Sequence, residues 1–444
     1  MIKPVGFLGH PRGLAFLFGS ELWERFSYYG MRALLVLYMV EHLLTPERLT
    51  GALGLAELKR ALEALSGPLP PQPFASQIYG LYTGLVYLTP VLGGVVADRL
   101  LGRTRTIAIG AAMMVAGHFM MADERLFLVA LLLIAFGCGA FKPNVSTQVG
   151  ELYASGDGRR DRAYSIFYVG INIGAFLAPL VCGTLGEKYG WHYGFVAAGI
   201  GMGVGLATYL SGRAFLPPDA LPRGAAAAAA DPRLKRALFC IALLFLPSTL
   251  FWAAFEQQGN TIALWAATST DRGVGISGWR AEIPVTWFQA FNPLMIFLLT
   301  PPLVALWARL AAQGREPSTL RKLSIGCIGV AMSYGVMALA AYWSAGARAS
   351  WLWLLAYFVV ITLAELHFSP IALSLVSRLA PEGARAALMG AWFGSMFLGN
   401  LAAGWLGGFW SSMPTQQFFL LMAALGIVGA AILEAARRPL AFLT

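Results

Sequence analysis

Charged residues are scarce in this sequence. Only 12% of its 444 residues are Asp, Glu, Lys or Arg, whereas a soluble domain carries about 25%. Hydrophobic residues make up 58%, and the mean hydropathy is +0.65. So few charges cannot cover a soluble surface, which excludes a cytosolic enzyme, a secreted scaffold and a disordered chain. The composition therefore indicates a polytopic membrane protein.

Cysteines and chemical motifs are equally sparse. The four cysteines lie in apolar stretches with no metal-pair spacing, so we interpret them as buried apolar thiols: Cys138, Cys182, Cys240 and Cys327. The chain has no His-Glu-x-x-His metal site, no Gly-x-Ser-x-Gly elbow and no Walker loop. We therefore expect no enzyme activity, no ATP-driven transport, no metal and no cofactor. No cleavable signal is evident, because the first apolar segment carries charges and runs past any Ala-x-Ala-like site.

Long apolar runs are what the sequence has in abundance. A helix needs about 20 mostly apolar residues to cross a bilayer, and backbone amides in lipid must pair within the segment. This scale predicts an all-α protein with twelve spans, near residues 14–41, 76–98, 105–122, 126–153, 162–186, 191–211, 237–267, 284–309, 321–343, 351–379, 385–409 and 415–436. The loop at 42–75 contains a short amphipathic helix around residues 55–62.

The distribution of Lys and Arg predicts the orientation. With the N-terminus inside, 21 of these residues fall in inside segments and 8 in outside loops. Cytoplasmic loops carry such an excess, so both termini are predicted to be cytoplasmic. The net charge of +10 then reflects basic loops, and we expect no nucleic-acid partner.

One long connection divides the chain. Residues 211–236 contain Pro217-Pro218 and the alanine run 225–230, a composition typical of a linker. We predict an N-terminal six-helix bundle at 1–210, a cytoplasmic linker at 211–236 and a C-terminal six-helix bundle at 237–444.

The two halves share short matches in corresponding spans. Leu88-Thr89-Pro90 recurs as Leu299-Thr300-Pro301, and Phe141-Lys142-Pro143 recurs as Phe368-Ser369-Pro370. Two matches in the same register indicate a duplicated six-helix unit. Parallel repeats of this kind are typical of the major facilitator architecture. The segment from Gly94 to Arg105 also matches the Gly-x-x-x-Asp-Arg-x-x-Gly-Arg loop of that superfamily, in which Asp and Arg can pair or cap a helix end.

Charges within the spans are the strongest functional signal. Each costs about 3 kcal/mol or more near the bilayer centre, so we expect them to face one polar cavity and to neutralise one another. They comprise four acids and three bases: Glu21, Glu24, Arg25, Arg32, Lys142, Glu256 and Glu365.

The first predicted span concentrates these charges. Glu21, Glu24, Arg25 and Arg32 share an arc of roughly 140° with two tyrosines, at 100° per residue. Such a stripe has two interpretations, ion pairs that lock helix packing or a lining for a polar ligand and protons. The second is favoured because a lock needs two charges and this helix carries four.

Several segments resemble one family. Glu21 to Gly30 reads Glu-Leu-Trp-Glu-Arg-Phe-Ser-Tyr-Tyr-Gly and resembles the Glu-x-x-Glu-Arg-Phe-x-Tyr-Tyr-Gly signature of proton-dependent oligopeptide transporters, a family of the major facilitator superfamily. Phe167 to Gly174 resembles that family's Phe-Tyr-x-x-Ile-Asn-x-Gly motif. The segments at Phe141–Ser146, Trp252–Gly259 and Glu365–Ser374 are similar too, in family order.

The resemblance implies a proton-coupled symporter that imports di- and tripeptides by alternating access. The proton is the coupling ion, with Glu21, Glu24, Arg32 and Glu256 in proton coupling and Arg32 paired with Glu256. The peptide would contact Arg25 and Lys142 through its carboxylate and Asn172, Asn292 and Glu365 through its amino group. The pocket lining would consist of Tyr28, Tyr29, Tyr82, Trp252, Ser369 and Trp392.

The chain departs from the family in two places. The 26 linker residues cannot hold the two extra helices that many bacterial members carry between the halves, and Phe255 stands where some members have an acid. We expect a multi-pass protein of a bacterial-type inner membrane that works as a monomer in the lipid bilayer. The alternative is a proton-coupled facilitator for another small polar substrate such as nitrate, a drug or a sugar.

Overall fold

A computed structural model describes residues 6–154, 156–219, 232–276, 279–344, 346–379 and 385–437. These residues are nearly all helical, as predicted. The chain folds into two compact units. Unit 1 comprises Met1–Pro71 and Leu85–Gly224, and unit 2 comprises Gln72–Gly84 and Ala225–Thr444. The predicted bundle bounds at 210 and 237 stay a prediction.

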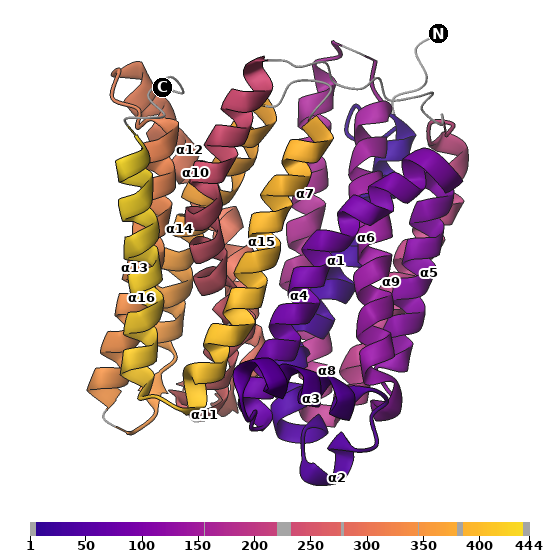
Figure 1. Cartoon of the computed structure of the whole chain (residues 1–444). Helices are drawn as coiled ribbons and strands as arrows, with labels where there is room; N and C mark the ends of the chain where they lie inside the picture. Colours follow the sequence, from indigo (N-terminus) through magenta and orange to yellow (C-terminus); the bar gives the residue numbers. More distant parts are fainter. Residues whose placement is uncertain are drawn as a thin grey trace. The chain divides into compact units, whose positions relative to one another are not determined.

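Unit 1 is built from long helices that end in short 3-10 or π segments (Figure 1). Its α-helices are α1 (Arg12–Tyr38), α2 (Pro46–Leu49), α3 (Leu55–Ser66), the second part of α4 (Pro71–Val96), α5 (Arg103–Met120), α6 (Phe127–Glu151), α7 (Arg159–Ala178), α8 (Thr184–Tyr189) and α9 (Trp191–Ser211). Its π-helical turns are η1 (Met39–Leu43), η2 (Ala97–Leu101) and η4 (Pro179–Gly183), and its 3-10 turns are η3 (Glu124–Leu126) and η5 (Arg213–Phe215).

Unit 2 has the same character and adds short strands. Its α-helices are α10 (Pro232–Phe255), α11 (Thr261–Thr268), α12 (Phe291–Ala312), α13 (Thr319–Ser344), α14 (Leu352–Leu379), α15 (Arg385–Gly407) and α16 (Thr415–Ala436). The 3-10 turns are η6 (Glu256–Gly259), η7 (Val285–Ala290) and η9 (Gly408–Ser411), and the strands are β1 (Thr270–Asp271), β2 (Gly273–Ile276), β3 (Trp279–Glu282) and β4 (Ala349–Ser350).

Each of the twelve predicted spans coincides with a helical run. Within the described ranges, nine helical segments are long and apolar enough to cross a membrane. The helix α1 is not among them, since its length includes Glu21, Glu24, Arg25 and Arg32. The predicted amphipathic helix is confirmed as α3.

The seventh predicted span is not one continuous helix. It changes from α10 to the 3-10 turn η6 at Glu256 and resumes as α11 at Thr261. Side chains satisfy the polar groups at this break, because Gln257 Nε2 donates to Ala403 O at 2.8 Å and Asn260 Nδ2 donates to Gln257 Oε1 at 3.2 Å. The break is stable inside a membrane protein because its backbone is covered by protein.

Helix packing in unit 1 centres on α1, which contacts α7 and α9, while α5 packs against α6. In unit 2, α13 contacts α14 and α16, and α10 packs on α15. The first part of α4 also belongs to unit 2. There its Gly80 approaches α15 so closely that a Cβ atom would lie 2.6 Å from Asn400 O, which favours glycine at this contact.

The repeated Leu-Thr-Pro matches adopt the same local structure. Thr89 Oγ1 donates to Leu85 O at 2.9 Å, and Thr300 Oγ1 donates to Ile296 O at 2.6 Å. Pro90 and Pro301 follow inside their helices, where proline removes a backbone donor. In both helices the threonine before the proline therefore donates a side-chain hydrogen bond to the backbone carbonyl four residues earlier.

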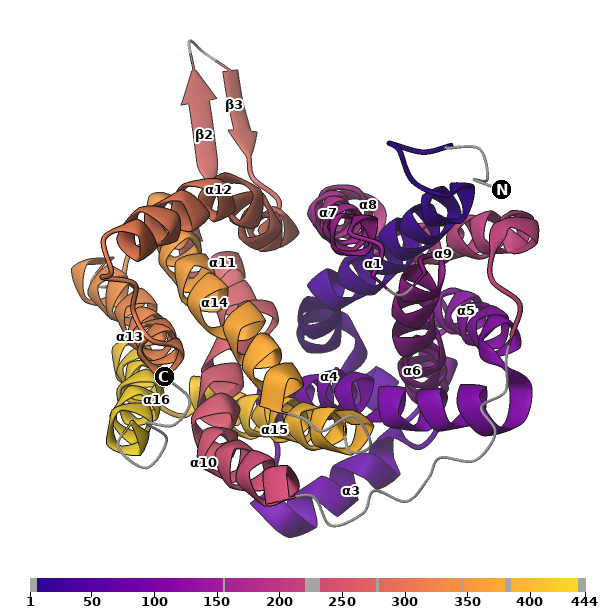
Figure 2. The same cartoon turned by 90° about the horizontal axis from the view of Figure 1, so that it is seen from above.

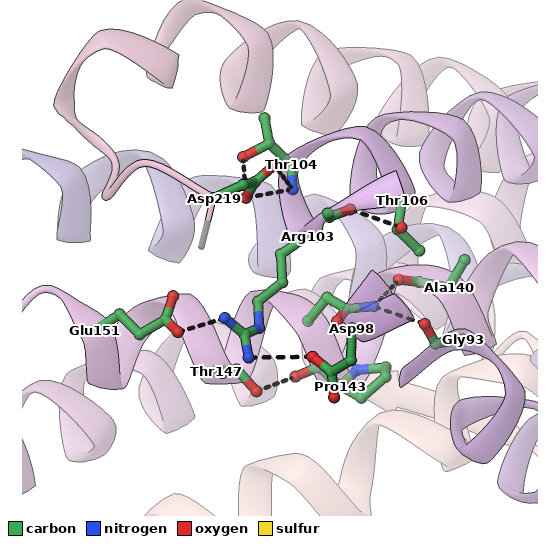
Figure 3. A network of polar contacts seen from close by, with 12 residues as sticks. Gly93, Asp98, Arg103, Thr104, Thr106, Ala140, Pro143, Thr147, Glu151 and Asp219 are labelled. Carbon is green, nitrogen blue, oxygen red and sulfur yellow. Dashed lines mark hydrogen bonds and ion pairs between the residues drawn. The ribbon is translucent and has the colours of Figure 1, made fainter. Parts of the chain in front are cut away.

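The Gly94–Arg105 loop forms a polar network at the start of α5 (Figure 3). Arg103 pairs with Glu151 of α6 and with Asp98 at 3.2 Å. Asp219, which follows α9, accepts from Thr104 N at 3.1 Å and from Thr104 Oγ1 at 3.0 Å. The expected Asp–Arg pair is therefore present, but Asp219 is the residue that caps the helix end.

The sequence reading missed a β-hairpin. Strands β2 and β3 pair antiparallel and project away from the helices of unit 2 (Figure 2). Arg272 links the two strands at the base of the hairpin. It forms an ion pair with Glu282 at 2.7 Å and donates a hydrogen bond to Ile283 O at 3.0 Å. Strand β3 alternates apolar and charged residues, but each strand has only four residues. Strand β2 also contains two glycines, which strands disfavour.

Candidate functional site

The charged stripe of α1 folds into a buried ion cluster. Arg25 Nε lies 2.8 Å from Glu21 Oε1 and 3.0 Å from Glu24 Oε2. The exposed fractions of Glu21, Glu24 and Arg25 are 1%, 0% and 4%. One guanidinium therefore compensates two buried carboxylates. Glu21 Oε2 is buried and has no hydrogen-bond partner within the described part of the chain.

Helix α6 adds two side chains to this region from the same face. Cys138 Sγ donates to Glu24 Oε1 at 3.4 Å. One turn later, Lys142 Nζ lies 5.2 Å from the centre of the Tyr87 ring, within cation–π range. Pro143 follows inside the helix. The sequence pointed to Lys142, but neither Cys138 nor Tyr87 was expected in the site.

The aromatic residues of α1 continue the stripe. The rings of Tyr28 and Tyr29 meet edge to face with centroids 5.2 Å apart. The Arg32 guanidinium lies 5.8 Å from the centre of the Tyr29 ring. Asn172 on α7 is buried, and its Nδ2 donates to Tyr168 O at 3.0 Å. Unit 1 thus presents cations, phenols and an amide on α1, α6 and α7.

The charged residues predicted for the site that lie in unit 2 are two acids, Glu256 and Glu365. Asn292 Nδ2 donates to Glu365 Oε2 at 2.8 Å and to Thr362 Oγ1 at 3.1 Å. This contact joins α12 to α14, and Ser369 lies one turn beyond Glu365 on α14. Asn292 and Glu365, both predicted to bind the peptide amino group, therefore contact each other.

Glu256 lies at the helix break and is only 2% exposed. Tyr79, on the part of α4 that belongs to unit 2, donates to Glu256 Oε2 across 3.5 Å. Glu256 is the first residue of the 3-10 turn, so its carboxylate leaves the chain in a different direction than it would from a continuous α-helix. Tyr79 was not predicted, since an isolated tyrosine in an apolar span carries no sequence signal.

Aromatic side chains pack tightly around the same part of unit 2. Trp252 meets the Phe251 and Phe255 rings edge to face at 5.4 and 5.3 Å. Phe251 stacks on Phe368 of α14 with centroids 4.0 Å apart. Tyr82 and Trp392 are also buried in unit 2. The predicted lining residues are thus ordered by packing within their own unit.

The predicted site residues fall into two sets. Unit 1 holds Glu21, Glu24, Arg25, Tyr28, Tyr29, Arg32, Lys142 and Asn172, while unit 2 holds Tyr82, Trp252, Glu256, Asn292, Glu365, Ser369 and Trp392. Direct contacts join Glu21, Glu24 and Arg25 in one set, and Asn292 and Glu365 in the other. The predicted pair of Arg32 and Glu256 and the convergence of all seven charges on one chamber stay predictions.

Comparison with known proteins decides the family. The model of the POT family matches residues 104–224 and 223–428. The chain belongs to the POT family. It is 35% identical to the peptide transporter YePEPT of Yersinia enterocolitica, over 90% of this chain and 88% of that protein. It is 33% identical to a di-/tripeptide transporter of Lactococcus lactis, over 98% of this chain and 96% of that protein.

A solved structure agrees with this membership. A crystal structure of a POT peptide transporter in complex with sulfate matches with a TM-score of 0.85 at 30% identity, over 99% of this chain and 97% of that one. The predicted major facilitator fold is thereby confirmed, and the chain is a multi-pass membrane protein of a transporter family.

Proposed function

We propose that this POT-family chain is a proton-coupled symporter that imports di- and tripeptides by alternating access. The observation that carries the proposal is the buried cluster of Glu21, Glu24 and Arg25. A membrane span bears such a cluster only at a cost, and in this chain the family's signature residues form it.

The charges of the two units suit a zwitterion. Unit 1 carries the bases Arg25, Arg32 and Lys142 against the acids Glu21 and Glu24, so one positive charge is in excess when all are ionised. The predicted site charges of unit 2, Glu256 and Glu365, are both acids.

A peptide carboxylate would balance the excess positive charge of unit 1 through Arg25 and Lys142. The peptide amino group would balance the negative charge of Glu365, and Asn172 and Asn292 would be its neutral hydrogen-bond partners.

Side-chain tolerance follows from the remaining lining. Tyr28, Tyr29, Tyr82, Trp252 and Trp392 offer large contact areas without demanding one side-chain chemistry, and Ser369 adds a hydroxyl. Recognition by the two termini would then accept many peptides. We expect modest affinity because desolvation of the polar ends offsets much of the contact energy.

Glu256 is the proposed main coupling acid. Arg32 would supply the compensating cation for this buried carboxylate. When the peptide carboxylate draws on the cations, Glu256 loses compensation and takes up a proton. Its protonation would weaken the contacts that hold one conformation, so the transporter can change the side to which it opens.

The setting follows the family. The protein would work as a monomer in a bacterial-type inner membrane with both termini in the cytoplasm, with the proton as coupling ion and no cofactor. The excess of Lys and Arg in the predicted inside loops supports this orientation.

Uptake into proteoliposomes tests the proposal. A labelled dipeptide should accumulate when the lumen is alkaline, and a protonophore should abolish that accumulation. Arg25→Gln should remove uptake, whereas Arg125→Gln changes an exposed arginine outside the cluster and should not. Unlabelled tripeptide should compete with the dipeptide. Competition by nitrate, a sugar or a drug, with none by tripeptide, would assign the chain to another substrate.

A further inference from the structure

Helix α6 holds a thiol against the α1 cluster. Cys138 Sγ donates to Glu24 Oε1 at 3.4 Å, and both side chains are fully buried. Cys138 precedes Lys142 by one helical turn, so both leave α6 on the face that meets α1. The position of the thiol is therefore part of the site, although its sequence context is apolar.

The surroundings of Glu24 contain few groups that can respond to its charge. Arg25 Nε lies 3.0 Å from Glu24 Oε2, and Glu21 is the second carboxylate on Arg25. Lys142 is the cation on α6. Helices α7 and α9 also pack on α1. Cys138 is a neutral donor to the Glu24 carboxylate.

The strength of this donor matters because Glu24 is fully buried. A buried carboxylate without donors is strongly disfavoured, whereas a strong donor would stabilise its ionised form. A thiol lies between these limits, since it is a weak donor and also a weak acceptor. It can donate to the carboxylate and accept from the carboxylic acid.

We propose that Cys138 is a positioning residue that sets how readily Glu24 takes up and releases the coupling proton. This inference rests on the proposed function, because it requires that Glu24 takes part in proton coupling.

Two substitutions of Cys138 provide the test, with proton-driven dipeptide uptake measured against pH. Cys138→Ala removes the donor, so protonation becomes easier and the midpoint of the uptake profile should move to higher pH. Cys138→Ser supplies a stronger donor, so the midpoint should move to lower pH. Each shift should be about half a pH unit to one unit.

The opposite signs separate positioning from packing. Alanine and serine both leave a smaller side chain than cysteine, so a role in packing alone would affect both variants alike. Cys182→Ala and Cys182→Ser are the matched controls, since Cys182 is equally buried and packs against Gly30 of α1. Equal shifts at Cys182, or shifts of one sign at Cys138, would overturn the inference.

An infrared measurement examines the contact without transport. The S–H stretching band that Cys138→Ala removes should lie at lower frequency than the Cys182 band, because donation to a carboxylate weakens the S–H bond. Glu24→Gln should raise its frequency. A band unmoved by Glu24→Gln rejects the contact, whereas absence of wild-type peptide accumulation rejects the proposed function.

Discussion

The two units solve the burial of charge in different ways. In unit 1, Arg25 contacts both Glu21 and Glu24, so the ions compensate one another within a single helix. In unit 2, neutral donors contact the acids, Asn292 at Glu365 and Tyr79 at Glu256. Loss of one ion leaves uncompensated charge in the first arrangement.

This difference suggests a division of labour. An internally compensated cluster is costly to disrupt, so a carboxylate in it can change its charge only together with a change at its partners. Glu256 and Glu365 each accept a hydrogen bond from a neutral donor, and that donor remains a partner when the acid gains a proton or meets an ammonium group.

Arg25→Ala should have the largest effect. It leaves two buried carboxylates without the cation that contacts them, so the free energy of unfolding should fall by about 3–5 kcal/mol and dipeptide uptake should cease. Thermal unfolding in detergent and proteoliposome uptake measure the two losses. Adding Glu21→Gln should recover part of the stability without restoring uptake. Full stability in Arg25→Ala alone would show that the cluster is not internally compensated.

Glu256→Gln should abolish proton-driven accumulation while changing the free energy of unfolding by no more than about 1 kcal/mol. The amide keeps a hydrogen-bonding group at the Tyr79 hydroxyl but cannot carry a proton across. Gradient-free peptide exchange should survive. Glu316→Gln, on an exposed acid, is the control and should leave accumulation intact. Retained accumulation in Glu256→Gln would reject Glu256 as the coupling acid.

Asn292→Ala should raise the KM for dipeptide by about tenfold. It removes the 2.8 Å donor that orients Glu365, while the maximal rate should change little. Thr362→Val removes the other partner of Asn292 and should alter the KM by less than about twofold. Equal effects of the two variants would mean that Glu365 does not need this donor.

Asp219→Ala tests a contact outside both sites. It removes the acceptor of Thr104 N and Oγ1 at the start of α5, and loss of such a cap costs about 1 kcal/mol. Asp219→Asn keeps an acceptor and should be nearly neutral. The melting temperature in detergent gives both values, and uptake per folded molecule should be unchanged.

Asp157→Asn concerns an exposed ion pair and should have the smallest effect. Hydrogen bonds from Arg159 lower the pKa of Asp157 from 3.8 to about 2. Its contribution to stability is therefore complete above pH 3.8 and is lost as the pH falls through about 2. The melting temperatures of wild type and variant should differ by a constant small amount near neutral pH and converge in acid. A difference that grows in acid would contradict this assignment.

Much of the fold is predictable because membranes impose simple rules. Every predicted span coincides with a helical run, since length and hydropathy alone decide which segments can cross lipid. The helix break at Glu256 was not predictable, because it depends on Gln257 and Asn260 finding partners, one of them on α15 and distant in sequence. The β2–β3 hairpin was missed because its strands have only four residues each and β2 contains two glycines.

The site residues also divide into those that the sequence could predict and those that depend on tertiary contacts. The charged stripe on α1 could be derived from helical spacing, because all its members lie on one helix. Cys138 and Tyr79 could not, because their contacts join α6 to α1 and α4 to the turn η6. The four cysteines are buried as predicted, but Cys138 also serves as a donor.

Composition and the order of residues along the chain are enough to specify a polytopic helical protein, the helices that carry charge and the family signature. These properties are local, since they depend on the free energy of placing each segment in lipid. Which carboxylate meets which donor is decided only by helix packing, because such contacts join residues up to 177 positions apart. The weak thiol donor at Glu24 and the exposed cap at Asp219 belong to this second class.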